Sequence, residues 1–194
     1  MNSYIIRPIG QPADVAAIVS YPWGGEYQPR AAACLNWSKD GFAIEMIAWE
    51  HPVSCAERRI GGEVCVDSCM EFFFQPCPET DPRYINCEVN AGGVVHLAVG
   101  EGRMHRDIQL ALPQGVAPEV VINDGEKWSV KYELPAEWIL HWFPDFKFES
   151  GMKMRGNFYK CEESIHPHFG CWNPVTSPEP DFHRPDNFGT LIFQ

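Results

Sequence analysis

A β-strand is predicted for residues 66 to 74, which run Val66-Asp67-Ser68-Cys69-Met70-Glu71-Phe72-Phe73-Phe74. Successive side chains of a strand point to opposite faces. One face therefore carries the apolar side chains of Val66, Met70, Phe72 and Phe74. The other face carries Cys69 and Phe73, with Asp67 and Glu71 in the same row. A strand that is apolar on both faces is usually covered on both sides, so we expect this strand at the centre of the fold.

Glu71 interrupts the apolar pattern in the middle of this strand. Burying a carboxylate without partners is costly. We therefore expect one of two arrangements. Either Glu71 is held by a neighbouring side chain, with Arg155 or Trp172 as the candidate, or it faces a water-filled groove. The sequence leaves both open.

Further short strands separated by turns are predicted along the chain. They are residues 32–37 and 42–49 around Asp40-Gly41, 84–90 and 94–99 around Ala91-Gly92-Gly93, 119–122 and 128–134 joined through Asn123-Asp124-Gly125, 152–160, and 188–193. A short helix is expected within residues 12–19, and one helical turn with Pro at its first position within residues 135–140. Loops are expected at 51–63, 75–83 and 170–185. This pattern predicts an all-β fold, an antiparallel two-sheet β-sandwich with short helical turns.

The length and composition fit one domain. A chain of 194 residues can bury a single sizeable core, so we expect one domain over residues 1–194, with residues 1–30 as an N-terminal arm packed on it. The net charge of −11 argues against nucleic acid and against an anionic membrane surface as partners. No signal peptide or membrane span is recognisable, which predicts a cytoplasmic protein, or an extracellular one if a leader has been removed.

Eight cysteines, at positions 34, 55, 65, 69, 77, 87, 161 and 171, allow either four disulfides or free thiols. Free thiols are favoured, because most of the cysteines fall within apolar strand patterns. The spacing Cys65-x-x-x-Cys69 would separate its two thiols along one strand, so no metal site is expected there. The pair His166 and His168 is expected to lie in a solvated loop rather than to bind a metal, because two ligands do not make a site.

Polar side chains alternate with apolar ones on two more strands. In residues 84–90 the odd positions are apolar and face a core, so the even positions, which include Glu88 and Asn90, are expected to face solvent or a groove. In residues 152–160, Arg155 and Asn157 share one face with Tyr159.

Four motifs in order resemble the family 9-like branch of the carbohydrate-binding modules. They are Asp67-Ser68-Cys69-Met70-Glu71-Phe72-Phe73, Tyr84-Ile85-Asn86-Cys87-Glu88-Val89-Asn90 before a Gly turn, Arg155-Gly156-Asn157-Phe158-Tyr159, and Cys171-Trp172-Asn173-Pro174 followed by Phe182-His183-Arg184-Pro185 and Phe188-Gly189-Thr190-Leu191. The resemblance covers roughly residues 30 to 194. It implies a β-sandwich with a sugar-binding groove, of the kind often appended to xylan- or cellulose-degrading enzymes. The best-known members clamp the reducing-end sugar between two Trp rings, and polar side chains fix its hydroxyls.

This sequence departs from that pattern at the clamp. The first clamp Trp would fall where Val64 and Cys65 stand, and the second at or beside His183, next to Phe182. An Arg that members carry beside the Asn of the second strand is Glu88 here. The resemblance also allows a structural calcium ion, which cannot be assigned to particular residues; no other cofactor is expected.

The sequence therefore predicts non-catalytic binding of a small saccharide or a polysaccharide end. The candidate site residues are Glu71, Glu88, Asn90, Arg155, Asn157, Trp172, Asn173 and His183. Arg155 and the Asn side chains would bind hydroxyls, and the aromatic rings would stack. One alternative is an interaction or scaffold protein that has lost the sugar site, for which a homodimer is allowed. A less favoured alternative is a glycoside hydrolase with Glu71 and Glu88 as its two carboxylates.

Overall fold

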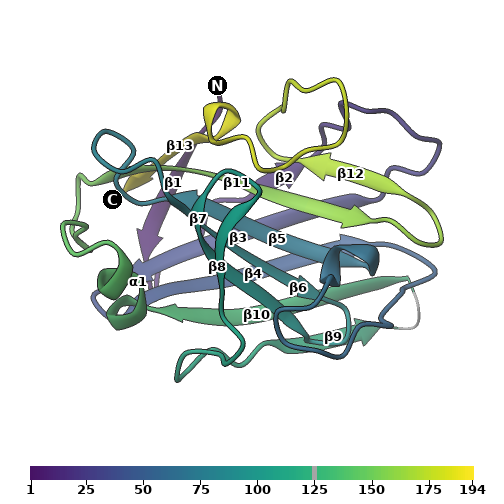
Figure 1. The fold of residues 1–194 in the computed structure, drawn as a ribbon, viewed down its shortest axis with the longest axis horizontal. Coiled ribbons are helices and arrows are strands. Elements are labelled where there is room, and N and C mark those ends of the chain that lie inside the picture. Colours follow the sequence, from purple (N-terminus) through teal and green to yellow (C-terminus); the bar gives the residue numbers. More distant parts are fainter. Residues whose placement is uncertain (124–125) are drawn as a thin grey trace.

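A computed structural model describes residues 1–123 and 126–194, and in this part of the chain thirteen strands form two stacked sheets joined at one side (Figure 1). The first sheet contains β5 (Cys69–Gln75), β6 (Tyr84–Asn90), β7 (Val95–Glu101), β8 (His105–Ile108), β11 (Lys153–Glu162), β12 (His168–Cys171) and β13 (Gly189–Phe193). The second contains β2 (Ala16–Ile18), β3 (Arg30–Ser38), β4 (Gly41–Trp49), β9 (Glu119–Asn123) and β10 (Lys127–Pro135). The helical segments are α1 (Ala136–Trp142), η1 (Val64–Val66) and η2 (Pro185–Asn187).

Strand β1 (Ser3–Pro8) connects the two sheets. Its first half pairs with β13 of the first sheet and its end pairs with β3 of the second. The neighbour order is thus β8-β7-β6-β5-β11-β13-β1-β3-β4-β10-β9. The predicted all-β sandwich is confirmed, with one difference: both pairings of β1 are parallel, whereas the other strand pairs are antiparallel. Two of the thirteen strands, β1 and β2, lie within residues 1–30.

The central strand is β5, and it is covered on both faces as expected. Met70, Phe72 and Phe74 project into the main core between the sheets, where Phe72 stacks on Phe74 with ring centroids 4.7 Å apart. Phe73 projects from the other face into a second apolar cluster under the last loop of the chain. The strand begins at Cys69, because residues 64–66 form the turn η1 instead of extended chain.

The predicted hairpins are confirmed for β3–β4, β6–β7 and β9–β10. The first depends on Gly41, whose φ of 136° favours glycine and whose Cβ, if present, would lie 2.1 Å from the carbonyl oxygen of Leu134. The predicted turn Asn123-Asp124-Gly125 falls partly on residues 124 and 125, outside the described residues.

Two local predictions are wrong, and a third is confirmed in part. The helix expected within residues 12–19 is instead strand β2, because Ala16 and Ile18 are buried with a period of two against β3. The helical turn expected at 135–140 is confirmed in place as the seven-residue helix α1 (Ala136–Trp142), but Pro135 precedes the helix as its N-cap and is not its first residue. His168, expected in a solvated loop, and the first two residues of the loop expected at 170–185 belong to β12, and His168 is fully buried. In the described residues no helix has the length and apolar character needed to cross a bilayer.

Candidate functional site

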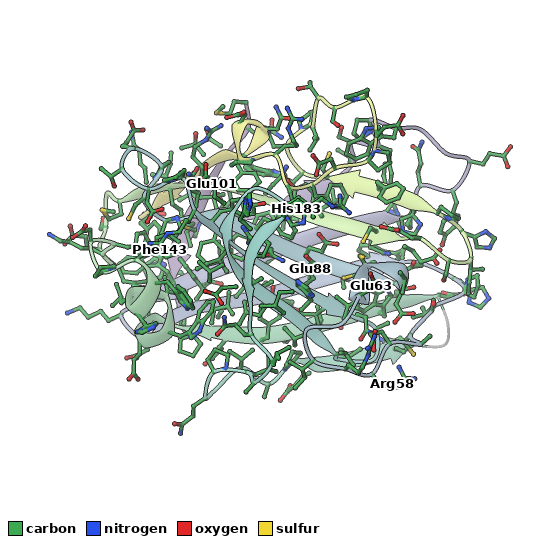
Figure 2. All side chains as sticks on the ribbon, in the orientation of Figure 1. Arg58, Glu63, Glu88, Glu101, Phe143 and His183 are labelled. Carbon is green, nitrogen blue, oxygen red and sulfur yellow. The ribbon has the colours of Figure 1, made fainter. Side chains whose placement is uncertain are left out.

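A small polar cleft lies on the outer face of the first sheet, between η1 and the last loop of the chain. Its volume is about 70 Å³. Strand β5 supplies Glu71 and Phe73, and β6 supplies Glu88, while the loop after β12 supplies Asp181, Phe182 and His183. The remaining lining residues are Cys65, Arg103, Cys161, Glu163, Phe169 and Pro180. Figure 2 labels Glu88 and His183 on this face of the molecule.

Two carboxyl groups, Glu71 and Glu88, form the floor of the cleft. They are directly opposite each other in the β5–β6 ladder, so their side chains project from the same face. Both are almost fully buried, at 2% and 7% exposure. Burial raises the pKa of Glu71 well above its usual value, and the neighbouring Glu88 raises it further. Burial also raises the pKa of Glu88, opposed by His96 and by a 2.8 Å hydrogen bond from Asn86 Nδ2.

The donor to Glu71 is a thiol. Cys161 Sγ lies 2.9 Å from Glu71 Oε1 and donates to it. Neither of the partners expected from the sequence takes this place: Arg155 Nη2 donates to the carbonyl oxygens of Asp186 and Phe188 instead, at 3.0 and 2.9 Å, and Trp172 packs in the main core. Glu71 is thus held by a weak donor and also borders the cleft, so it combines features of both expected arrangements.

His183 forms one wall of the cleft as a neutral imidazole. Its Nδ1 lies 2.6 Å from the hydroxyl of Tyr84, and its ring packs on Phe73 with centroids 5.1 Å apart. Burial lowers the pKa of His183 to about 3, and the nearby cations Arg106 and Arg103 lower it in the same direction. The ring is therefore uncharged at neutral pH, with a fixed orientation set by Tyr84.

Asn90 lies outside the cleft and holds the turn after β6. Its Nδ2 donates to Asp67 at 2.8 Å, and its Oδ1 accepts the backbone N–H groups of Gly92 and Val94 at 3.0 and 2.9 Å. All of its strong hydrogen-bonding positions are engaged within the chain. The structure gives it a clear role in the turn, and its predicted role toward a sugar stays a prediction.

Asn157 and Asn173 also lie outside the cleft, where they bond to each other. Asn157 Nδ2 donates to the Asn173 carbonyl and Asn157 Oδ1 accepts the Asn173 N–H, both at 2.8 Å. The Asn173 side chain connects the start of the chain to the segment before β13, because it accepts a hydrogen bond from the backbone N–H of Asn2 and donates one to the carbonyl oxygen of Asn187.

Trp172 and Arg155 are the last two predicted site residues that lie outside the cleft. Trp172 is 8% exposed and packs edge-on against Phe158 with centroids 5.9 Å apart, as part of the main core. Arg155 anchors the segment of η2 through the two carbonyl contacts given above. Of the eight predicted site residues, Glu71, Glu88 and His183 line the cleft together.

The two positions expected for the aromatic clamp meet at this cleft. Cys65 lines one side, and Phe182 with His183 lines the other. Val64, the other candidate for the first position, is fully buried in the second apolar cluster. Phe182 is already stacked on Tyr159, with centroids 4.0 Å apart and ring planes at 11°. The cleft therefore has an aromatic wall at the second clamp position and the Cys65 thiol at the first.

Sequence reasoning missed Arg103, Asp181 and Cys161 as cleft residues. Arg103 and Asp181 lie in loops and approach each other to 3.7 Å, and no periodicity marks them. Cys161 could have been found, because it continues the alternation of Arg155, Asn157 and Tyr159 along β11. The missing information was its register against Cys69 on β5.

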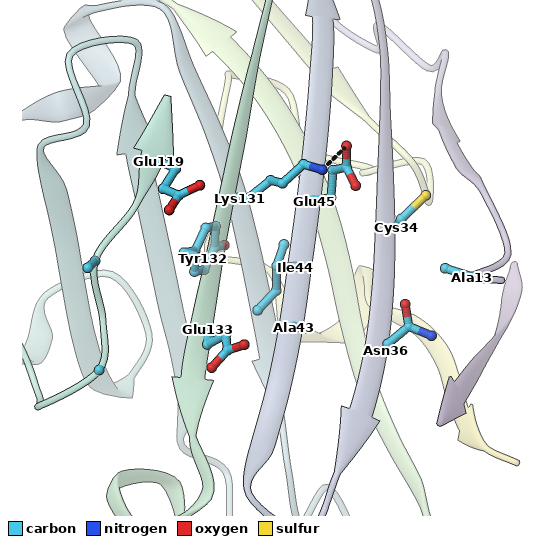
Figure 3. Close-up of a pocket in the computed structure, with 12 residues that line it drawn as sticks. Ala13, Cys34, Asn36, Ala43, Ile44, Glu45, Glu119, Lys131, Tyr132 and Glu133 are labelled. Carbon is cyan, nitrogen blue, oxygen red and sulfur yellow. Dashed lines mark ion pairs between the residues drawn. The ribbon is translucent and has the colours of Figure 1, made fainter. Parts of the chain in front are cut away.

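A second, larger groove crosses the outer face of the second sheet and has a volume of about 550 Å³ (Figure 3). The strands β3, β4 and β10 supply most of its lining. Lys131 and Glu45 form an ion pair of 3.1 Å across its floor, and Asn36 and Glu133 lie beside them. It is open and polar, and no residue predicted for the site lies in it.

The architecture and the cleft define a two-sheet β-sandwich module with a small acidic cleft on one sheet. The sequence profile described as Carbohydrate-binding family 9 matches residues 11–193. The chain therefore belongs to carbohydrate-binding family 9, and the resemblance inferred from the four motifs is confirmed. No curated protein matches the sequence.

Three solved structures have the same fold. A candidate carbohydrate-binding protein from Bacteroides uniformis ATCC 8492 is 24% identical, with a TM-score of 0.83 over 99% of both chains. A family 9 carbohydrate-binding module from Caldicellulosiruptor kristjanssonii in complex with cellotriose is 11% identical, with a TM-score of 0.69 over 100% of this chain and 94% of the other. A second structure, a family 9 module from the same organism in complex with glucose, is 12% identical, with a TM-score of 0.65 over 100% and 96%. At these identities the likeness establishes the fold.

Proposed function

We propose that this chain binds carbohydrate without chemical turnover, and that a small saccharide or a polysaccharide end is held at the cleft of Glu71, Glu88 and His183. The observation that carries the proposal is the meeting, in one cleft, of both expected clamp positions with two carboxyl groups from neighbouring strands. Family membership and the family 9 structures with cellotriose and glucose support the same ligand class.

The lining of the cleft suits sugar hydroxyls. Carboxyl oxygens of Glu71 and Glu88 accept hydrogen bonds from hydroxyl groups, and the Arg103 guanidinium donates to hydroxyl oxygens. The small exposed part of Phe182 in the cleft offers an apolar contact to a C–H group of a pyranose ring. These groups together match the alternation of apolar and polar surface on a sugar.

The size of the cleft limits how the sugar is held. A volume of about 70 Å³ corresponds to about two water molecules at ~30 Å³ each. One hydroxyl or hydroxymethyl group of a terminal sugar fits this space, and the ring then lies over the mouth against Phe182. Because few groups would be fully desolvated, we expect an affinity between μM and mM, or roughly −8 to −4 kcal/mol.

The test is isothermal titration calorimetry against mono- and oligosaccharides that include glucose and cellotriose. Glu88→Gln and His183→Ala should each weaken binding at least tenfold. Lys131→Met is the matched control, because it alters the larger groove on the other sheet and leaves the cleft intact. Flat titrations across the whole panel would remove the function. Loss of binding in Lys131→Met alone would move the ligand to the other sheet.

A second candidate function is a sandwich-fold interaction protein that has lost the sugar site. The small volume of the cleft and the presence of Cys65 and His183 at the clamp positions favour it. Strand β9 supplies a surface for association, since Val121 and Ile122 are 52% and 48% exposed and β9 pairs only with β10 in the described residues. Light scattering distinguishes this candidate: a homodimer that Val121→Lys converts to monomer supports it, and a monomer that binds saccharide excludes it.

A further inference from the structure

Three potential metal ligands lie together on the cleft side of the first sheet. The ligand atoms of Cys69, Glu71 and Cys161 are all within 4.8 Å of one another. All three residues are buried, with exposures of 0%, 2% and 1%. A tetrahedral Zn²⁺ with Zn–S bonds of about 2.3 Å places two sulfur ligands about 3.8 Å apart, so the three groups are near the spacing that such an ion needs.

The β-ladder produces this arrangement. Cys69 and Glu71 are two residues apart on β5 and therefore share a face. Cys161 on β11 is the direct partner of Cys69, which places its side chain on the same face. Two ligands thus come from one strand and the third from its neighbour, and all three positions are fixed by a regular, buried backbone.

Without a cation, this cluster must keep its protons. The Cys161 thiol donates to Glu71 Oε1 at 2.9 Å. Burial raises the pKa of Cys69 to about 12, and a hydrogen bond with Cys69 together with burial raises the pKa of Cys161. A divalent cation would replace protons in this dry environment and turn two thiols and a carboxyl into their anionic, ligating forms.

We propose that Cys69, Cys161 and Glu71 form a binding site for a thiophilic divalent cation of the Zn²⁺ class. Two thiolates and one carboxylate match the sulfur and oxygen ligands that Zn²⁺ accepts. Two of the three ligands, Glu71 and Cys161, also line the cleft together with Cys65 and Glu163, so a fourth ligand could come from the cleft. A closed structural site supplies four protein ligands, whereas three ligands with one open position leave room for water or for a group of a bound ligand.

The test uses the full chain, reduced and freed of metal with a chelator, and titrated with Co²⁺ and then Zn²⁺ in the absence of sugar. We expect one equivalent of Co²⁺ to bind with a thiolate-to-metal absorption band in the near ultraviolet, and Zn²⁺ to displace it. Cys69→Ser and Cys161→Ser should abolish that band, and Glu71→Gln should weaken binding at least tenfold. Cys34→Ser is the matched control, since Cys34 lies on the second sheet, and it should leave the titration unchanged.

X-ray absorption on the Zn²⁺-loaded wild type keeps the test decisive if a cysteine variant fails to fold. At least two sulfur neighbours at about 2.3 Å are expected. A shell of oxygen and nitrogen alone, an unchanged Co²⁺ band in Cys69→Ser, or a disulfide between Cys69 and Cys161 that persists in the reduced protein would each overturn the proposal. The saccharide titrations are to be run on the same chelator-treated, metal-free protein, so that failure of metal binding and failure of sugar binding are separate results.

Discussion

A buried charge cluster between the two sheets provides the sharpest test of the energetics of this fold. Lys160 on β11 is fully buried and forms a 2.9 Å ion pair with Glu50, which follows β4 and is itself 1% exposed. Lys160 Nζ also lies 2.9 Å from His168 Nε2 and 2.7 Å from the carbonyl oxygen of Cys161. Trp128 Nε1 donates to the second oxygen of Glu50 at 2.6 Å. The Lys160 ammonium group therefore has three partners within hydrogen-bonding distance, all of them protein atoms.

The perturbation is Lys160→Met, which keeps the apolar stem and removes the ammonium. Glu50 then stays buried as an uncompensated carboxylate, a situation that costs roughly 3–5 kcal/mol. Lys131→Met is the matched control, because Lys131 pairs with Glu45 at 3.1 Å but both side chains are more than half exposed. An exposed pair of this kind contributes about 0–1 kcal/mol. The two variants therefore differ in burial and little else.

Urea denaturation of both variants measures the difference. We expect Lys160→Met to lower the free energy of unfolding several times more than Lys131→Met. The double variant Glu50→Gln/Lys160→Met should recover part of the loss, since it removes the stranded charge and keeps an acceptor for Trp128. Equal decreases in the free energy of unfolding for Lys160→Met and Lys131→Met would refute the reasoning, because burial would then not determine how much an ion pair contributes to stability.

His168 adds a pH signature to the same experiment. Burial lowers the pKa of His168 from 6.5 to about 4, and the charge on Lys160 contributes in the same direction. Between these pH values the unfolded chain binds a proton that the folded chain does not. The wild type should therefore lose about 3 kcal/mol as the pH falls from 6.5 to 4. In Lys160→Met the imidazole can take up the proton 3.6 Å from Glu50, so the penalty of this substitution should be smaller at about pH 5 than at about pH 7.5.

Three further predictions concern the loop before β5, the core and the cleft. Asp67 accepts four hydrogen bonds, three of them from the loop of residues 54–57, so Asp67→Ala should cost about 3 kcal/mol and speed amide exchange in that loop; unchanged exchange would contradict this. A Cβ on Gly189 would lie 2.4 Å from Trp172 Cζ3, so Gly189→Ala should lower stability by about 1–3 kcal/mol in a thermal melt, and a neutral result would show that the ring moves freely. Glu71 and Glu88 flank a cleft too small for a sugar ring, so aryl glycosides should be hydrolysed no faster by the wild type than by Glu71→Gln/Glu88→Gln, and a clear excess would restore the hydrolase alternative.

The strands could be predicted because their burial follows a period of two. β5 and β6 alternate between two covered faces, and the hairpin of β3 and β4 is marked by Gly41. The short strand β2 was missed because three residues carry too little periodicity to outweigh a local helix signal, and its pairing with β3 decides its conformation. β1 was also not predicted, because its conformation depends on pairing with β13 and β3, two strands that lie far from each other in the sequence.

The site could be predicted only in part, because a polar side chain within a strand has two different uses. Asn157 on β11 and Glu71 on β5 lie on the same face of two paired strands, and in the sequence both appear as polar residues within a strand. In the structure the two side chains differ in their hydrogen-bond partners. Asn157 makes two hydrogen bonds to the backbone of Asn173 and thereby holds the loop after β12. The donor to Glu71 in the described residues is a single thiol, that of Cys161.

The difference in hydrogen bonding between Asn157 and Glu71 bears on which of the two residues could bind a ligand. A buried carboxyl group is costly when its acceptors are not filled, and a buried carboxyl with a raised pKa in a cleft is a candidate for a binding role. Glu88, directly opposite on β6, raises the pKa of Glu71 further, although Glu71 stands in a strand that is otherwise largely apolar. Both carboxyl groups line the hollow on the outer face of the first sheet. Hydroxyls of a sugar, or a cation between Glu71 and the two thiols, are the kinds of group that would complete them.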